Sequence, residues 1–356
     1  MIDYNNLIER ITLPTAEEFE NSYMKTVTPV VITDLYSGEE IRDITSRDKV
    51  IEHWGNIRIP VQDEYLKAYE EHTKKTGTLR DKDSTLEDMA TMTIAEYYRY
   101  VDENPNEKKM CIEFSTPDAI RKYYSVPEMC IPQEGESNSI VQQCFVGNKG
   151  NVANIHFDKA GHHGFLFQIF GRKRFIVFPH SAAKKLLPLT QTSGWKLQNF
   201  TEQDRQDFLR FTGGKEVILE SGEAMFVPAY CWHYADYIED SMAVRVRFRR
   251  PNHFTELLNF MYPDMYTQGI LHKIADPIKA NSEYREVLVR LKECAEHHYS
   301  DGKQKVHAIR ELTKKIYFEL YPEEPHDNYS LDLEKHFPSL LPHFLDAEHP
   351  DRPIYQ

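Results

Sequence analysis

His156 and Asp158 stand one residue apart, and a third candidate ligand, His233, closes the run Pro228–His233 much later in the chain. Side chains alternate between the two faces of a strand, so a strand through the first pair directs Asn154, His156 and Asp158 to one side. A second strand must then bring His233 to the same place. The pattern therefore favours a fold in which two strands distant in the sequence become neighbours.

Two imidazoles and one carboxylate form a ligand set that binds a redox-active divalent metal and leaves coordination positions open. A His-x-Asp pair alone is weak evidence, because a chain with 16 histidines contains such a pair by chance. The alternative is that both histidines are ordinary buried residues and that Asp158 is a turn acid. We favour the metal site because each residue lies in a context that suits a shared site. His162 and His163 are rival ligands, but their adjacency sends them to opposite faces of any strand.

The residues between 137 and 250 are typical of a β-rich domain. Short β-branched and aromatic runs are separated by glycine-containing turns; these runs are Ile140–Val146, Gly164–Phe170, Lys173–Phe178 and Met242–Phe248. Many short strands with such turns favour a sandwich or barrel over a sheet built from βαβ units. One long connection, 179–215, interrupts them and carries helical patterns.

The flanking sequence differs in character from this β-rich part. Helices are expected behind Thr15 and Thr93, and apolar residues at helical spacing dominate the C-terminal part. The acidic tail after Pro322 is expected to lie on the surface. We therefore divide the chain into a mixed N-terminal region that packs on the core, the β core and a helical region, with the bounds 1–136, 137–250 and 251–356.

The bulk composition excludes some classes of protein. A net charge of −13 and an isoelectric point near 5.7 argue against a non-specific nucleic-acid binder, which needs a basic surface. The five cysteines include no Cys-x-x-Cys pair, which predicts free thiols in a reducing compartment. No secretion signal and no run of about 18 apolar residues are visible. We expect a cytoplasmic protein, or a nuclear one if the source is eukaryotic.

Three blocks of the sequence resemble the Jumonji-C (cupin-8-type) 2-oxoglutarate oxygenases. The likeness is greatest to the small branch that contains the factor-inhibiting-HIF asparaginyl hydroxylase. The blocks stand in the family's order, as Val146–Asp158, Phe167–Pro179 and Gly222–His233, and the resemblance is strong over 140–250. It implies a mainly β core, a double-stranded β-helix (jelly-roll, cupin-like), with flanking N-terminal α/β elements and a C-terminal helical region.

The same resemblance implies an activity. His156, Asp158 and His233 would bind Fe(II), with 2-oxoglutarate and O2 as co-substrates. The expected reaction couples decarboxylation of 2-oxoglutarate to succinate with hydroxylation of a peptide, a protein side chain or a peptide-like small molecule. The alternatives are a demethylase of the same family, a metal cupin that does not use 2-oxoglutarate, and a non-catalytic pseudo-oxygenase scaffold.

Lys173 is the residue that the resemblance assigns to the far carboxylate of 2-oxoglutarate. Alternation places Lys173 on one strand face with Phe175 and Val177. A lysine on an inward apolar face is costly unless an anion meets it. The alternative is a strand-end lysine whose ammonium group reaches water.

Other candidate contacts are less defined. The asparaginyl-hydroxylase branch has a threonine three residues before the first ligand, where this chain has Ala153. Gln143, on the inward face of the first core strand, or Asn154 is expected to replace the missing hydroxyl. Arg245 and Arg247 share one strand face. If that face is interior, Arg247 provides a second anion site, for 2-oxoglutarate or for a substrate carboxylate; otherwise the two arginines form a basic edge.

The expected partners follow from these interpretations. The substrate is a peptide, a protein or a small peptide-like molecule, and neither nucleic acid nor membrane is expected. The amphipathic pattern around His253–Met261 favours a homodimer through the C-terminal helices.

Overall fold

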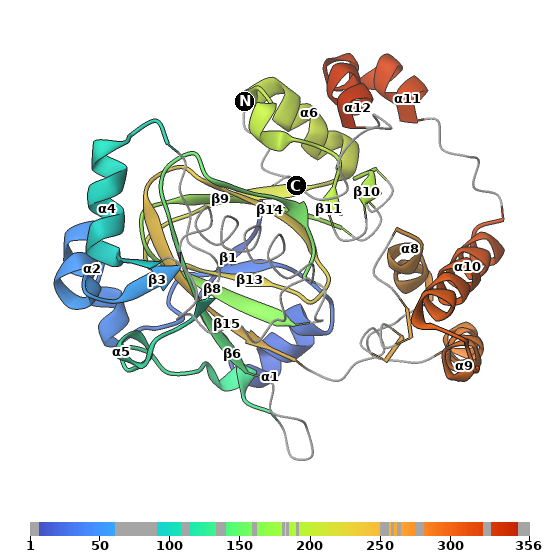
Figure 1. Cartoon of the computed structure of the whole chain (residues 1–356), viewed down its shortest axis with the longest axis horizontal. Coiled ribbons are helices and arrows are strands. Elements are labelled where there is room, and N and C mark those ends of the chain that lie inside the picture. The colour runs from blue at the N-terminus through green and yellow to red at the C-terminus, as the bar shows by residue number, and fades with distance from the viewer. Residues whose placement is uncertain are drawn as a thin grey trace.

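The computed structural model describes most of the chain, and its elements are shown in Figure 1. The described residues are 7–60, 91–107, 114–132, 140–158, 162–179, 182, 185–189, 192–249, 256–257, 260–261, 265–274, 281–322 and 329–347. Most of His253–Met261, the basis of the dimer prediction, lies outside them. Within these ranges no helix combines the length and apolar character needed to cross a membrane.

Two sheets form the centre of the described structure. The first has the strand order β1 (Arg10–Ile11), β2 (Val30–Ile32), β13 (Ala224–Val227), β8 (His163–Phe170), β15 (Ser241–Phe248), β6 (Val141–Gly147), β5 (Phe114–Ser115). The second has the order β10 (Pro188–Leu189), β11 (Thr192–Ser193), β7 (Val152–His156), β14 (Trp232–Tyr237), β9 (Lys173–Phe178), β12 (Lys215–Leu219). Strands β6 to β9 alternate between the two sheets, and the pairing is antiparallel except between β1 and β2. This is the predicted double-stranded β-helix.

Alternation along the strands fills the space between the sheets with apolar side chains. Phe175 and Val177 from the second sheet meet Leu166, Met225 and Ala243 from the first in one buried cluster. These side chains contact one another because period-two alternation sends every second residue inward. The interior of the β core is therefore packed, and any polar group in it needs a partner.

The N-terminal elements cover the outer face of the first sheet. Phe19, Trp54 and Tyr97 pack against Phe165 and Phe226 of that sheet in a single buried cluster. Strand β2 also joins the sheet directly, because it pairs with β13. The other described elements of this part are α1 (Ala16–Phe19), η2 (Glu20–Met24), η3 (Glu40–Asp43), α2 (Arg47–Trp54), β3 (Arg58–Pro60), β4 (Thr91–Thr93), α4 (Ile94–Glu103), α5 (Asp118–Arg121) and η5 (Glu128–Cys130).

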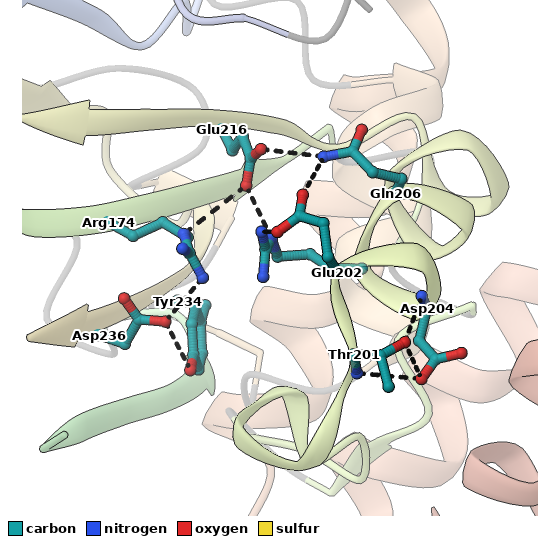
Figure 2. Close-up of polar contacts among 9 residues, drawn as sticks. Arg174, Thr201, Glu202, Asp204, Gln206, Glu216, Tyr234 and Asp236 are labelled. Atoms are coloured by element: carbon teal, nitrogen blue, oxygen red, sulfur yellow. Dashed lines mark hydrogen bonds and ion pairs between the residues drawn. The ribbon is translucent and has the colours of Figure 1, made fainter. Parts of the chain in front are cut away.

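Helix α6 (Glu202–Thr212), which follows η7 (Leu197–Asn199), covers the outer face of the second sheet. It begins at a capping box, in which the Thr201 hydroxyl accepts from the Asp204 amide and the Asp204 carboxylate accepts from the Thr201 amide (Figure 2). It ends at Gly213, whose positive φ of 72° suits a left-handed C-cap. These signals are readable in the sequence, and α6 confirms that the connection 179–215 contains a helix.

An ion-pair network attaches α6 to the second sheet. Arg174 of β9 pairs with Asp236 of β14 (Nη1–Oδ2 3.2 Å) and lies near Glu216 of β12 (Nε–Oε2 3.9 Å) (Figure 2). Glu216 accepts hydrogen bonds from Arg205 and Gln206 of α6, each at 3.2 Å. Because several charges share partners, such a network is worth more than isolated surface pairs.

The C-terminal region is helical, as predicted. Helices α8 (Met265–Ile274), α9 (Ser282–Glu296) and α10 (Gly302–Leu320) share a buried apolar cluster. The tail after Pro322 differs from the prediction, because α11 (Tyr329–His336), η8 (Pro338–Leu340) and α12 (Leu341–Ala347) pack beside α6 (Figure 1). The packing depends on Leu333, Leu340 and Phe344, which are buried in the same cluster as α6. These apolar residues are widely spaced among prolines and acids, so the sequence gives no clear helical pattern.

We expect Phe344→Ala to lower the free energy of unfolding by about 3–5 kcal/mol, because a buried aromatic ring is removed and a cavity remains. Phe344 is 3% exposed, and its ring centroid lies 5.9 Å from that of Trp195. The matched control is Leu345→Ala, because the Leu345 side chain is 59% exposed. This change should alter the free energy of unfolding by less than about 0.5 kcal/mol. Urea denaturation measures both. Equal effects of the two changes would contradict the packing of this tail.

Candidate metal centre

The pairing of β7 with β14 brings the three candidate ligands together. His156 lies opposite His233 in the antiparallel register, and Asp158 follows two residues beyond the end of β7. One ligand atom from each of the three residues lies within 4.8 Å of the others. The two imidazole centroids are 4.3 Å apart. The predicted cluster is therefore present as a geometric unit.

Backbone carbonyls orient both imidazoles. Nδ1 of His156 lies 2.7 Å from the carbonyl oxygen of Asn154, and Nδ1 of His233 lies 2.9 Å from that of Cys231. A carbonyl oxygen only accepts, so each Nδ1 carries the proton and each Nε2 keeps its lone pair. Nε2 of His156 is 3.9 Å from Oδ1 of Asp158. The nitrogen lone pairs and this carboxylate oxygen converge in the way that metal ligation requires.

The carboxylate of Asp158 is shared between this cluster and two arginines. Its Oδ2 accepts from Nη2 of Arg245 at 2.5 Å and lies 4.0 Å from Nη2 of Arg247. Burial alone raises the pKa of Asp158, but Arg245, His233 and Arg247 hold this pKa well below its usual range. Asp158 is therefore ionised, with one oxygen held by guanidinium groups and the other directed to the histidines.

The histidine at the centre of the cluster stays neutral. Burial, and after it the nearby His156, lowers the pKa of His233 to about 3. Neutral imidazole and ionised carboxylate are the protonation states that bind a metal without first releasing a proton.

The donor set fits a divalent transition metal. Two imidazole nitrogens and one carboxylate oxygen suit Fe(II), and three ligands leave positions for other molecules. Among the described residues no cysteine belongs to this group of ligands. The cluster therefore lacks the thiolates that mark a structural zinc site.

The neighbouring histidines are not part of the cluster. His163 is 3% exposed, stacks between Phe226 and Phe248, and its Nδ1 accepts from the amide of Ala229 at 3.2 Å. It is a core residue. His162 lies outside the described metal cluster, and burial, followed by Arg247, lowers the pKa of His162 to about 4. Both outcomes agree with the preference for His156 over these rivals.

Lys173 lies in the interior of the β core. It is 2% exposed and shares its strand face with Phe175 and Val177. Its Nζ lies 4.2 Å from the ring centroid of Tyr237 and 5.6 Å from that of Phe145. The lysine therefore does not extend to water, and the aromatic faces stabilise its charge in part.

A β-bulge interrupts the alternation expected around Asn154. Ala153 pairs with Ala235 and His156 with His233, so β7 has one residue more than β14 between these pairs. This β-bulge places Ala153, which packs against the interior cluster, on the face that His156 uses. The backbone carbonyl of Asn154 accepts a hydrogen bond from His156. A single extra residue breaks the period of two on which the prediction depended.

Both arginines of β15 face the interior. Val244, Val246 and Phe248 join the outer cluster and Ala243 the inner one, so alternation turns Arg245 and Arg247 inward. Gln143 lies on the same side, and its Oε1 accepts from Nη1 of Arg247 at 3.3 Å. The sequence shows that the arginines share a face, but it does not show that Arg245 binds Asp158.

Gly164 leaves the room that Arg245 occupies. A Cβ atom at this position would lie 2.6 Å from Nε of Arg245, well inside van der Waals contact. Gly164 pairs with Arg247 in the β8–β15 register. A glycine on β8 thus permits the guanidinium to approach the carboxylate, and this signal is visible in the sequence only as a strand glycine.

Comparisons with known proteins agree with this fold and site. Residues 16–263 match the protein family described as "Cupin-like domain". Lysine-specific demethylase 8 of Xenopus tropicalis is 24% identical over 256 residues, which cover 68% of this chain and 53% of the relative. JmjC domain-containing protein D of Dictyostelium discoideum is 21% identical over 269 residues, 68% of this chain and 57% of the relative. Lysine-specific demethylase JMJ30 of Arabidopsis thaliana is 28% identical over 138 residues, 37% and 30% of the two chains.

These relatives are longer than the region they share with this chain. The chain spans about half the length of the demethylase 8 relatives that it matches. The asparaginyl-hydroxylase branch expected from the motifs is not among the relatives named above, which are demethylases and JmjC proteins. The comparisons therefore support the wider Jumonji-C group.

We expect His156→Ala, Asp158→Asn and His233→Ala each to weaken Mn(II) binding by more than about 100-fold. Removing a residue that hydrogen-bonds to a metal ligand already costs about 10- to 100-fold in affinity, and removing the ligand itself should cost more. Mn(II) is a stable substitute for Fe(II), and isothermal titration calorimetry measures the affinity. His162→Ala is the control and should bind Mn(II) as the parent protein does. Loss of Mn(II) binding in His162→Ala, with binding retained in His156→Ala, would show that His162 and not His156 is the metal ligand.

Proposed function

The chain belongs to the family of proteins with a cupin-like domain, and on that premise we propose that it is an Fe(II)- and 2-oxoglutarate-dependent oxygenase. The observation that carries the proposal is the cluster of His156, Asp158 and His233 beside the β7–β14 pair of a double-stranded β-helix. The names of its Jumonji-C relatives support the same class of enzyme. We propose hydroxylation of a peptide, a protein side chain or a peptide-like molecule as its reaction.

His156, Asp158 and His233 would hold the metal. Bound Fe(II) would supply the activation of dioxygen that couples decarboxylation of 2-oxoglutarate to oxidation of a substrate C–H bond. The chain's own residues keep the ligand set in its binding form. The two carbonyls fix the imidazoles, and Arg245 holds the second oxygen of Asp158 so that its first oxygen stays directed to the histidines.

Lys173 is the residue we propose for the far carboxylate of 2-oxoglutarate. Its ammonium group lies inside the β core. The attraction between this group and a carboxylate is stronger there than at a surface exposed to water. The branch threonine is replaced by Ala153, which lies on the correct face but offers no hydroxyl. Gln143, on the same side as Arg247, is the polar side chain that we propose as its replacement.

A demethylase of the same family is the second candidate. The printed names of two relatives, lysine-specific demethylase 8 and JMJ30, support it. Hydroxylation and demethylation both insert oxygen into a C–H bond, so the metal ligands serve either reaction. The closer placement beside the asparaginyl hydroxylases is supported by the three sequence blocks alone.

We expect Lys173→Ala to raise the KM for 2-oxoglutarate by about 10- to 100-fold, because a charge-assisted hydrogen bond is lost. Conversion of 2-oxoglutarate to succinate, followed by mass spectrometry without added substrate, measures it. Lys149→Ala is the control, since Lys149 is exposed in the turn between β6 and β7. An unchanged KM would contradict the proposed role of Lys173, whereas no conversion of 2-oxoglutarate by the parent protein would favour a metal cupin that does not use it.

We expect Gly164→Ala to weaken Mn(II) binding by about 10- to 100-fold, because the new Cβ displaces the Arg245 guanidinium from Asp158 without removing a charge. Calorimetry measures the affinity, and thermal unfolding confirms that the variant is folded. Gly302→Ala is the control, since a Cβ there meets no atom within 4 Å. Parent-like affinity in Gly164→Ala would show that Arg245 does not position the carboxylate.

A further inference from the structure

The ligand His156 has a strand neighbour on each side. On one side it lies opposite His233 of β14, and on the other it lies opposite Thr192 of β11. Strand β11 is two residues long and lies between β7 and the edge strand β10, which is equally short. Two strands of this length are at best marginally stable by themselves. Strand β11 therefore depends on further contacts to stay beside His156.

Trp195 supplies such contacts to the chain that leaves β11. Its side chain is 1% exposed, and its Nε1 donates to the carbonyl oxygen of Lys185 at 2.8 Å. This bond closes the base of the β10–β11 segment, because Lys185 precedes β10 and Trp195 follows β11. The Trp195 ring centroid lies 4.8 Å from that of Phe208 in α6 and 5.9 Å from that of Phe344 in α12. The indole thus joins β11 to α6 and to the C-terminal tail.

Helix α12 reaches the same segment at two further points. The ring centroids of His343 and Phe200 are 4.3 Å apart. Asp346 pairs with Lys196 (Nζ–Oδ2 3.4 Å), and both side chains are exposed. Exposed ion pairs contribute little, so the buried ring of Phe344 provides the main contact between α12 and this segment.

The tail also completes the apolar cluster behind the metal ligands. Ile155 and Phe157 flank His156, and they are 0% and 1% exposed. Both belong to the buried cluster that contains Trp195. The tail residues of the same cluster are Leu333, Leu340 and Phe344. The packing of α11 and α12 beside α6 (Figure 1) therefore extends to the residues on either side of a candidate metal ligand.

We propose that the docking of α12 on Trp195 positions His156 for metal binding, so that the C-terminal tail controls how tightly the metal centre holds its ion. This inference rests on the proposed function, because it takes His156 as a ligand, and it adds control of that site by a distant part of the chain. Trp195 and Phe344 are positioning residues, since they act through β11 and through the cluster behind His156. Undocking of α12 loosens β11 and lets the imidazole leave its binding position.

The test compares two truncations of buried side chains in the full chain. Phe344→Ala removes the contact with Trp195. Ile316→Ala is the matched control, because Ile316 is 0% exposed but belongs to the cluster of α8, α9 and α10 and not to the cluster behind the ligands. Calorimetry measures the affinity for Mn(II). Hydrogen exchange with mass spectrometry, in protein without metal, measures the opening of β7 and β11.

We expect Phe344→Ala to weaken Mn(II) binding by about 10-fold, the lower end of the range for residues that support a metal ligand. The amides of 152–156 and 188–193 should exchange faster than in the parent protein, because these strands open locally. His343→Ala should change both quantities in the same direction but less, since it removes only the contact with Phe200. Ile316→Ala should leave both at the parent values.

Parent-like affinity in folded Phe344→Ala overturns the inference, whether or not exchange changes. An equal loss of affinity in Ile316→Ala, or weaker binding without faster exchange of β7 and β11, overturns it as well. Thermal unfolding shows which variants are folded, and if Phe344→Ala is not, His343→Ala decides by the same measurements. The proposed function is judged separately in the parent protein, where Mn(II) binding without conversion of 2-oxoglutarate to succinate refutes the oxygenase alone. Absence of Mn(II) binding in the parent refutes both.

Discussion

The antiparallel pairing of β7 with β14 is the constraint on which the site depends. It places His156 opposite His233 although long stretches of chain separate them, and it positions Asp158 just beyond the strand end. A shift of one residue would send the imidazoles to opposite faces. The bulge beside this pairing adds a second condition, because it turns both Ala153 and His156 to the interior. Ligand geometry is thus a property of strand register.

The second determinant is the balance of charge inside the β core. A buried carboxylate beside two imidazoles is unfavourable unless cations meet it, and Arg245 fulfils this requirement for Asp158. The same interior contains Lys173 and Arg247. The metal-ligand cluster therefore lies beside buried cationic side chains.

Much of this arrangement could be predicted from the sequence. The short strands, the capped helices behind Thr15, Thr93 and Thr201, and the ligand trio follow from local patterns. Alternation along β9 also predicts the inward direction of Lys173. These features depend on residues close in sequence, whose periodicity survives folding.

Other features depend on contacts that local patterns do not contain. The bulge in β7 adds one residue to the strand and interrupts the simple alternation that the sequence predicts there. The contact between Arg245 and Asp158 needs the pairing of β15 with β8 and the space left by Gly164. The docking of the tail through Phe344 depends on Trp195, which lies far away in sequence.

The most direct test of the account is an anaerobic titration of the purified protein with Fe(II) and then with 2-oxoglutarate, followed by visible absorption. A three-residue site with adjacent open positions should allow 2-oxoglutarate to chelate the metal. The account predicts a charge-transfer band that appears only when both are present, saturates at one metal per chain and is absent in the His233→Ala variant. Tight Fe(II) binding without any such band, or a band of equal strength in that variant, would contradict it.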